Sequence, residues 1–208
     1  MRLNIGSHSV RHEGFLNVDI LPLENVDIVM DITKVPWSGR TPDGKIPKET
    51  GTVFTGVFMN ESVDEIMMVE VLEHISFHDT VNVLREIYRV LKPGGKLHIQ
   101  VPDCGSMMEM YADDALGGNF PKKVSPLMPH KPTSLDSALN IKAETGACVH
   151  PRRWLMAFCG AQKYGVPDIH KNIFTKEIMQ DNLEEAGFEH IDFNDDPLGW
   201  KIKVNVFK

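Results

Sequence analysis

The segment from residue 65 to residue 101 constrains the fold most, because its pattern indicates a strand, a helix and a second strand in succession. Residues 65–71 and 96–101 are short apolar runs. Between them, apolar side chains recur at the spacing of one helix face, at Val81, Leu84, Ile87 and Leu91. Asp79 is the expected cap of this helix, and Lys92-Pro93-Gly94-Gly95 ends it. A strand-helix-strand unit of this kind predicts a right-handed crossover and a parallel sheet.

Three further strands are predicted before this unit, at residues 3–5, 16–20 and 26–30. Several of the runs are nearly continuous in apolar residues, which is typical of strands covered on both faces. Residues 38–58 are rich in Gly, Pro, Thr and Lys and are expected to form a long loop or a small hairpin. The first half of the chain therefore indicates an α/β fold.

Residues 107–169 replace the short connection that such a fold needs at this point. They contain two helix candidates, at residues 135–144 and 151–164, and a run of spaced prolines at Pro121, Pro126, Pro129 and Pro132. Long segments without regular structure are uncommon in compact domains, and they often serve as lids. We expect residues 1–208 to form one domain that carries this insert or cap.

The pattern becomes regular again near the end of the chain. Thr175 is expected to cap a helix that places Met179, Leu183 and Ala186 on one face, with Gly187 as its terminator. Strands follow at residues 188–193 and 202–207. The turn-forming residues between them predict that this last pair is antiparallel.

Composition and charge exclude several classes of protein. Of the 208 residues, 42% are hydrophobic and 25% charged, which is ordinary globular composition. Acidic residues outnumber basic ones by 29 to 22, giving a net charge of -7 that argues against a general nucleic-acid binder. Three widely spaced cysteines (Cys104, Cys148 and Cys159) favour a reducing compartment over a disulfide framework. With no signal-peptide pattern or membrane-length apolar run, the expected location is cytoplasmic, away from membranes.

Polar residues and a glycine follow the first three predicted strands. Gly6 lets the backbone approach a ligand, although an ordinary tight turn explains it equally well. Asp19 suits two hydrogen bonds to a ribose diol, or else a turn. Asp31 and Ile32 suit an adenine amino group and ring, but a cap or turn is the preferred reading of Asp31 alone. The chain supplies only the first glycine of the dinucleotide fingerprint, which argues against a nicotinamide or nucleotide-sugar enzyme.

Taken in order, the motifs are more specific than any one of them. They are found at residues 4–6, 14–19, 64–66, 71–75, 84–97, 101–103, 170–171 and 184–188. This series resembles the class I S-adenosylmethionine-dependent methyltransferases, and within them the small type-11 group. The resemblance covers about residues 2–104 and 170–193.

The resemblance implies a Rossmann-like, seven-stranded and mostly parallel sheet with helices on both faces and an antiparallel last strand. It also implies S-adenosylmethionine as the cofactor, lying across the ends of the first, second and fourth strands. Carried over by position, Gly6 and Ser7 approach the methionine part, and Asp19 holds the ribose. The other implied cofactor contacts are Ile20, Asp31 and Ile32 around adenine, and Glu70 beside the sulfonium.

His8 departs from the family pattern, which usually has a second glycine at this position. A histidine there is compatible with a bond to the methionine carboxylate or with crowding of the site. We therefore count His8 among the cofactor contacts and keep two functions open. The first is methyl transfer to a small-molecule or glycan acceptor. The second is a catalytically inactive, methyltransferase-like binding or scaffold protein.

Histidines supply the candidates for a general base. His74 follows the fourth strand and is the best placed, although the family's histidine at this position often fixes the loop by hydrogen bonds. Other candidates are His130, His150, Tyr164 and His170. The pairs His8/His12 and His74/His78 have the spacing of one helix face, but neither falls in a predicted helix. No metal site is therefore predicted.

The second helix candidate of the insert begins Pro151-Arg152-Arg153-Trp154. Its aromatic residues are expected to pack the cap onto the sheet domain. The two arginines suit an anionic acceptor, such as a phosphorylated or carboxylated sugar. The sequence contains no pattern that fixes the acceptor or the oligomeric state.

Overall fold

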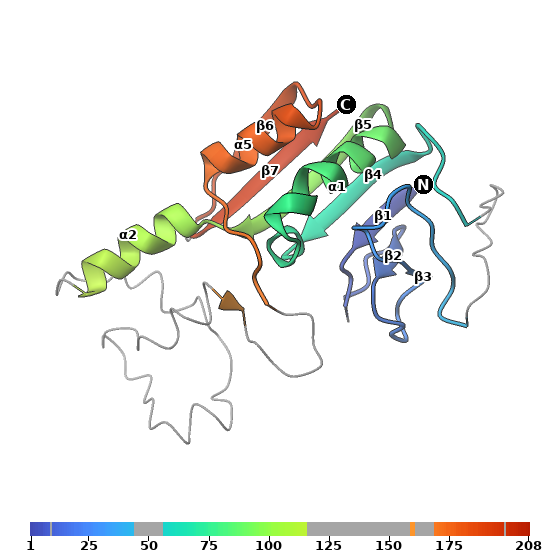
Figure 1. The fold of residues 1–208 in the computed structure, drawn as a ribbon, viewed down its shortest axis with the longest axis horizontal. Coiled ribbons are helices and arrows are strands. Elements are labelled where there is room, and N and C mark those ends of the chain that lie inside the picture. Colours follow the sequence, from blue (N-terminus) through green and yellow to red (C-terminus); the bar gives the residue numbers. More distant parts are fainter. Residues whose placement is uncertain (9, 44–55, 116–158, 161–168, 198) are drawn as a thin grey trace, which may run out of the picture.

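The computed structural model describes residues 1–8, 10–43, 56–115, 159–160, 169–197 and 199–208. These residues form one sheet of seven strands, shown in Figure 1. The strands are β1 (Arg2–Ile5), β2 (Leu16–Asp19), β3 (Ile28–Val29), β4 (Val63–Val69), β5 (Leu91–Pro102), β6 (His190–Asn194) and β7 (Lys201–Phe207).

The strand order is β3-β2-β1-β4-β5-β7-β6. The pairs from β3 through β5 are all parallel, whereas β7 runs antiparallel to both β5 and β6. The predicted Rossmann-like α/β sheet with an antiparallel last strand is therefore confirmed. Because β1, β2, β3 and β4 run in one direction, their carboxyl ends meet at the same edge of the sheet, where open α/β sheets bind ligands.

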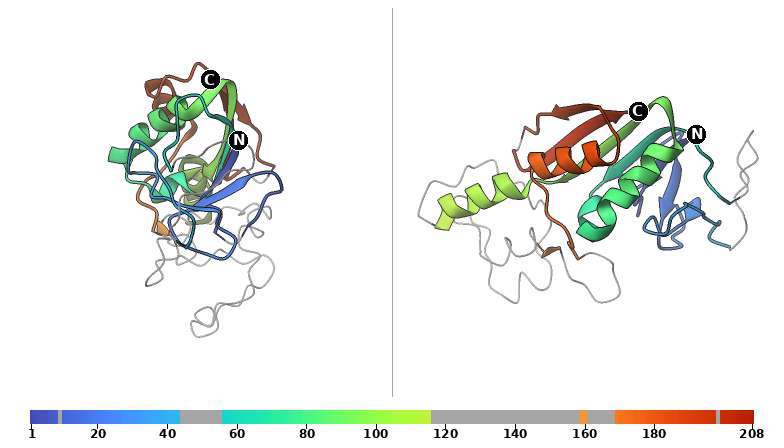
Figure 2. Two further views of the ribbon diagram at one scale, coloured as in Figure 1. Left: turned by 90° about the vertical axis from the view of Figure 1, so that its right-hand side faces the viewer. Right: turned by 45° about the horizontal axis from the view of Figure 1, so that its top comes forward.

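Two helices pack side by side on one face of the sheet, as both views in Figure 2 show. They are α1 (Phe77–Val90) and α5 (Lys176–Glu185). Tyr88 and Phe188 meet edge to face where the two helices adjoin, with ring centroids 5.1 Å apart. Thr175 caps α5 by accepting a hydrogen bond from the Ile178 N–H, as predicted, and Gly187 follows the helix with φ +104°.

The predicted cap of α1 was wrong. Ser76, not Asp79, is the N-cap, and its hydroxyl accepts a hydrogen bond from the His78 N–H. Asp79 lies inside the first turn of the helix. A carboxylate there still stabilises the helix through the partial positive charge of its N-terminus, so the two positions give similar sequence signals.

The two faces of the sheet differ in polarity. Along β5, Leu97, Ile99 and Val101 are fully buried, while His98 and Gln100 between them remain partly exposed. The apolar members of this alternation form the core together with α1 and α5. Helices on the second face of the sheet are not found within the described ranges, and that part of the expected architecture stays a prediction.

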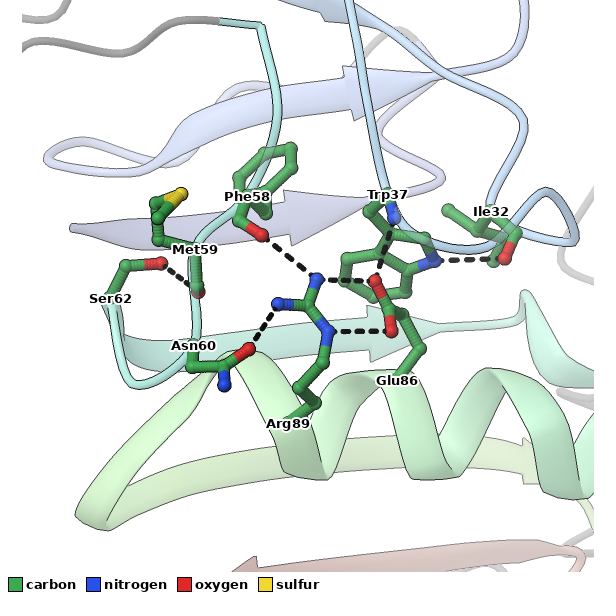
Figure 3. A network of polar contacts seen from close by, with 8 residues as sticks. All are labelled: Ile32, Trp37, Phe58, Met59, Asn60, Ser62, Glu86 and Arg89. Carbon is green, nitrogen blue, oxygen red and sulfur yellow. Dashed lines mark hydrogen bonds and ion pairs between the residues drawn. The ribbon is translucent and has the colours of Figure 1, made fainter.

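A partly buried ionic network joins the chain between β3 and β4 to α1, as Figure 3 shows. Glu86 accepts hydrogen bonds from the Trp37 backbone N–H at 2.6 Å and from Arg89 at 2.8 and 2.5 Å. Arg89 also donates to the Phe58 carbonyl at 2.8 Å and to the Asn60 side chain at 2.7 Å. Only 7% of the Glu86 side chain is exposed, against 28% for Arg89, so the network joins distant segments around a buried carboxylate and a partly exposed guanidinium.

Parts of two predicted segments can be compared with the structure. Ser38 and Val57 form an antiparallel bridge, as expected at the base of a small hairpin, while residues 44–55 lie outside the described ranges. The insert begins within α2 (Cys104–Ala115). The helix candidate at 135–144 and most of the one at 151–164 lie outside the described residues. None of the helices described here is long and apolar enough to cross a membrane.

Candidate functional site

The turn after β1 has a backbone that only glycine fits at its first position. Gly6 has φ +67°, and a Cβ built there would lie 2.4 Å from Val71 Cγ2. The N–H groups of Gly6 and Ser7 both donate to the Val18 carbonyl, at 2.8 and 3.2 Å. These bonds turn the chain back over the end of β2. The glycine predicted from sequence thus permits a close approach between the turn after β1 and the segment after β4.

Ser7 places a hydroxyl inside this turn. The residue is 3% exposed, and its Oγ has no hydrogen-bond partner among the described residues. Leaving a buried hydroxyl without a partner costs about 1–3 kcal/mol. A polar group of a bound ligand that reached this hydroxyl would recover that cost.

Asp19 connects the end of β2 to the turn after β1. Its Oδ2 accepts the His8 backbone N–H at 2.9 Å, and its Oδ1 accepts the Leu21 N–H at 3.0 Å. The residue is 9% exposed. A carboxylate offers about four lone-pair positions, so each oxygen keeps capacity for a second donor such as a hydroxyl. His8 itself lies in the left-handed region, with φ +42°.

Asp31 and Ile32, the two predicted adenine contacts after β3, make different interactions in the structure. Asp31 Oδ1 accepts hydrogen bonds from the Thr33 N–H at 3.0 Å and the Thr33 hydroxyl at 2.7 Å, which is the turn that the sequence also allowed. Ile32 packs against the core, and its carbonyl accepts the Trp37 indole N–H at 2.9 Å. Ile20, by contrast, is 50% exposed and presents apolar surface after β2.

Glu70 follows β4 in a left-handed conformation, with φ +55°. Such a conformation is costly for a residue with a side chain and is often found at functional sites. Its Oε1 accepts a hydrogen bond from Gln100 at 3.1 Å and forms an ion pair with Lys201 at 2.9 Å. The structure therefore directs this carboxylate toward β5 and β7, where a lysine already balances its charge.

His74 ends the short 3-10 helix η1 (Leu72–His74), directly after β4. Its Nδ1 bonds to the Ile169 carbonyl at 3.2 Å, as expected of a histidine that fixes the loop. Its ring lies 5.1 Å from the ring of His170, centroid to centroid. Glu73 lies beside them and is 1% exposed. His74 therefore associates with a residue 96 positions away in sequence.

A shallow hollow of about 430 Å³ opens beside this histidine pair. It is lined by Phe77, His170, Lys171, Asn172, Ile173 and Ile178. Phe77 is 62% exposed and Ile173 is 46% exposed, so the hollow presents apolar surface to solvent. The candidate bases His130, His150 and Tyr164, with Arg152 and Arg153, lie outside the described residues.

Sequence reasoning missed two residues that shape this edge. Val71 contacts Gly6, and Glu73 is the buried carboxylate next to His74. Both belong to the motif Val71-Leu72-Glu73-His74-Ile75, which the sequence analysis used only as a family marker. The available signal is the acidic residue itself, because a glutamate within an apolar motif is seldom fully buried unless it has a partner.

Comparison with known proteins gives one family match and several distant structural likenesses. Residues 24–99 match the family described as a methyltransferase domain, which confirms the resemblance inferred from the motifs. No curated protein matches the sequence. The match begins before β3 and ends within β5, so it includes β4, η1 and α1.

The structural likenesses are to proteins of low sequence identity. A SAM-dependent methyltransferase from Thermotoga maritima is 14% identical, with a TM-score of 0.47 over 100% of this chain and 81% of that one. A didemethyltoxoflavin N1-methyltransferase from Burkholderia thailandensis is 10% identical, with a TM-score of 0.49 over 100% and 70%. A Bordetella parapertussis protein is 18% identical, with a TM-score of 0.40 over 72% of this chain, which spans only 40% of that protein.

Proposed function

With residues 24–99 matching the methyltransferase-domain family, we propose that this protein binds S-adenosylmethionine and transfers its methyl group to a small-molecule or glycan acceptor. The observation that carries the proposal is the hydrogen bonding of the turn after β1 to Asp19 at the carboxyl edge of the sheet. This edge, next to the first crossover, is where open α/β sheets bind nucleotide cofactors.

The residues at the edge fit such a cofactor by type and position. The turn at Gly6 and Ser7 suits the methionine end of the cofactor, because the Ser7 hydroxyl, which has no hydrogen-bond partner among the described residues, gains one there. The lone pairs that Asp19 keeps suit the two ribose hydroxyls. Ile20 offers an apolar surface for the adenine ring. His8, whose main chain completes the turn, faces the same part of the cofactor.

Three further positions complete the proposed site. Ile32 and Asp31 follow β3, and we place them at the far end of the adenine ring, where the Asp31 turn orients the main chain. Glu70 follows β4 and adds negative charge near the place of the sulfonium. Because Lys201 and Gln100 hold this carboxylate, its effect there is a weak long-range attraction and not a direct contact.

Methyl transfer depends mainly on the alignment of the acceptor atom with the methyl group. When bound, S-adenosylmethionine supplies an electrophilic methyl group, and the chain's part is to hold the acceptor atom in line with it. We assign the choice of acceptor to the insert at 107–169, which follows β5 and enters the same edge of the sheet through α2. The histidine at position 74 is assigned a positioning role, because its Nδ1 holds the Ile169 carbonyl.

Asp19→Asn is expected to weaken cofactor binding about 10- to 100-fold, because hydrogen bonds to a charged group contribute about 1.5–3 kcal/mol. Titration calorimetry with S-adenosylhomocysteine, the demethylated product, measures this directly. Asp181→Asn is the matched control, since Asp181 is an exposed residue of α5, and it should bind like the wild type. No saturable heat from the wild type, or equal affinity in Asp19→Asn, would contradict the proposal.

A catalytically inactive binding protein is the second candidate, and His8 is the observation that favours it. The residue occupies a left-handed conformation that glycine adopts without cost, at the position where the family has glycine. A side chain at this point narrows the space beside the turn.

His8→Gly is expected to bind S-adenosylhomocysteine more tightly and to unfold at a slightly higher temperature, since it removes about 1 kcal/mol of left-handed strain. The main-chain N–H that bonds to Asp19 remains in this variant. Calorimetry and thermal denaturation measure the two effects. Unchanged or weaker binding of S-adenosylhomocysteine would contradict the hypothesis that the His8 side chain crowds the site.

A further inference from the structure

Three metal-binding groups from two distant segments meet beside the carboxyl edge of the sheet. Glu73 and His74 belong to η1, and His170 precedes α5. One ligand atom from each lies within 4.8 Å of the others. Two imidazoles and one carboxylate form the donor set that zinc and other divalent transition metals use in proteins.

The orientation of His74 suits a metal ligand. The Ile169 carbonyl can only accept, so the Nδ1 that bonds to it at 3.2 Å carries the proton. In the neutral ring, the lone pair then lies on Nε2. Metal-binding histidines commonly donate their other ring N–H to a backbone carbonyl, which fixes the tautomer and the orientation of the ring.

The main chain holds the two segments together without help from an ion. The N–H groups of Lys171 and Asn172 donate to the Glu73 carbonyl at 2.8 and 3.1 Å. The Asn172 side chain donates to the Thr80 hydroxyl at 2.9 Å, which ties the segment to α1. The main chain around His170 is therefore already held beside Glu73, and binding requires the three ligand atoms, which lie within 4.8 Å of one another, to close to about 2.0–2.2 Å from one ion.

Burial and access differ across the cluster in a way that suits a cation. Glu73 is 1% exposed, and a carboxylate so far from water is stabilised by positive charge beside it. The two histidines are only partly buried. His170 also lines the hollow beside Phe77, which gives an ion an entry path and leaves a coordination position facing solvent.

We propose that Glu73, His74 and His170 form a binding site for a divalent transition-metal ion, with zinc as the reference ion and one position open to water or a ligand. The site clamps the segment before α5 onto the loop after β4. None of its three ligands belongs to the cofactor contacts proposed above, and zinc binding can be measured whether or not the chain transfers methyl groups.

The test is a calorimetric titration of zinc chloride into the full chain after treatment with a chelator. One equivalent is expected to bind, and to raise the thermal midpoint. His170→Ala should weaken this binding about 100-fold or more, because it removes a direct ligand. His190→Ala, at an exposed position in β6, is the matched control and should bind zinc like the wild type.

Two further readouts keep the result unambiguous. His170→Ala in the presence of chelator should unfold like the chelated wild type, which separates a lost ligand from a misfolded chain. The titration contains no S-adenosyl compound, so its failure is distinct from failure of the proposed function. Absence of stoichiometric zinc binding, or equal zinc binding by wild type and His170→Ala, would overturn the proposal and leave a metal-free hydrogen-bonded cluster.

Discussion

Gly6→Ala is expected to abolish measurable binding of S-adenosylhomocysteine and to lower the free energy of unfolding by about 3 kcal/mol. The added Cβ would lie 2.4 Å from Val71 Cγ2, and valine cannot rotate freely to avoid it. Overpacking of this kind costs about 1–3 kcal/mol. The left-handed φ of +67° adds about 1–2 kcal/mol for any residue with a Cβ.

Gly94→Ala is the matched control for this prediction. Gly94 has a similar φ of +74°, but a Cβ built there meets nothing within 4 Å. It should therefore show the backbone strain alone and bind the ligand normally. Adding Val71→Ala to Gly6→Ala should restore part of the stability, because it removes the clash. Equal effects of Gly6→Ala and Gly94→Ala on stability and binding would show that the contact with Val71 is unimportant.

The second large effect is expected in the network of Figure 3. Glu86→Ala should lower the free energy of unfolding by about 2–3 kcal/mol, measured by denaturant titration, because it leaves the Trp37 N–H without its acceptor and removes the charged partner of the partly exposed Arg89. Glu185→Ala is the control. Its ion pair with Arg85 is largely exposed and should cost under about 1 kcal/mol.

The same network gives the protein a dependence on pH. Burial alone would raise the pKa of Glu86, but hydrogen bonds from Arg89 and from the Trp37 N–H hold it below its ordinary value of 4.5. A carboxyl with a lowered pKa in the folded state stabilises the fold above its unfolded pKa and loses that contribution as the pH falls through the folded pKa. Unfolding free energy should therefore drop below about pH 4.5, and less steeply in Glu86→Gln. A drop of equal steepness in both would assign the effect to other carboxyls.

The succession of strands and helices along the chain was predictable, because each element rests on local sequence signals. The Lys92-Pro93-Gly94-Gly95 stop and the apolar helix face before it fix one crossover, and the hairpin at 195–199 fixes the final antiparallel pair. The first and last residues of the strands were less predictable. β3 contains only Ile28–Val29, although the apolar run extends over residues 26–30, and Val29 also forms an isolated antiparallel bridge with Arg40.

The details of the site depended on contacts between distant segments. The fold brings His74 to His170, which the sequence analysis had named only as a separate candidate base, because the segment before α5 returns to the loop after β4. Likewise, nothing local indicates that Glu70 faces Lys201, which is brought beside it by the antiparallel insertion of β7 next to β5. Such pairings follow from topology and cannot be read from a window of neighbouring residues.

The most direct test of a cofactor site at the ends of β1, β2 and β4 is an experimental structure of the protein with S-adenosylhomocysteine. We expect the homocysteine end of the ligand to lie at the Gly6–Ser7 turn, its ribose hydroxyls at Asp19, and its adenine beside Ile20 and Ile32. Ligand bound at another place, or no ligand at this edge at concentrations that saturate related enzymes, would contradict this expectation.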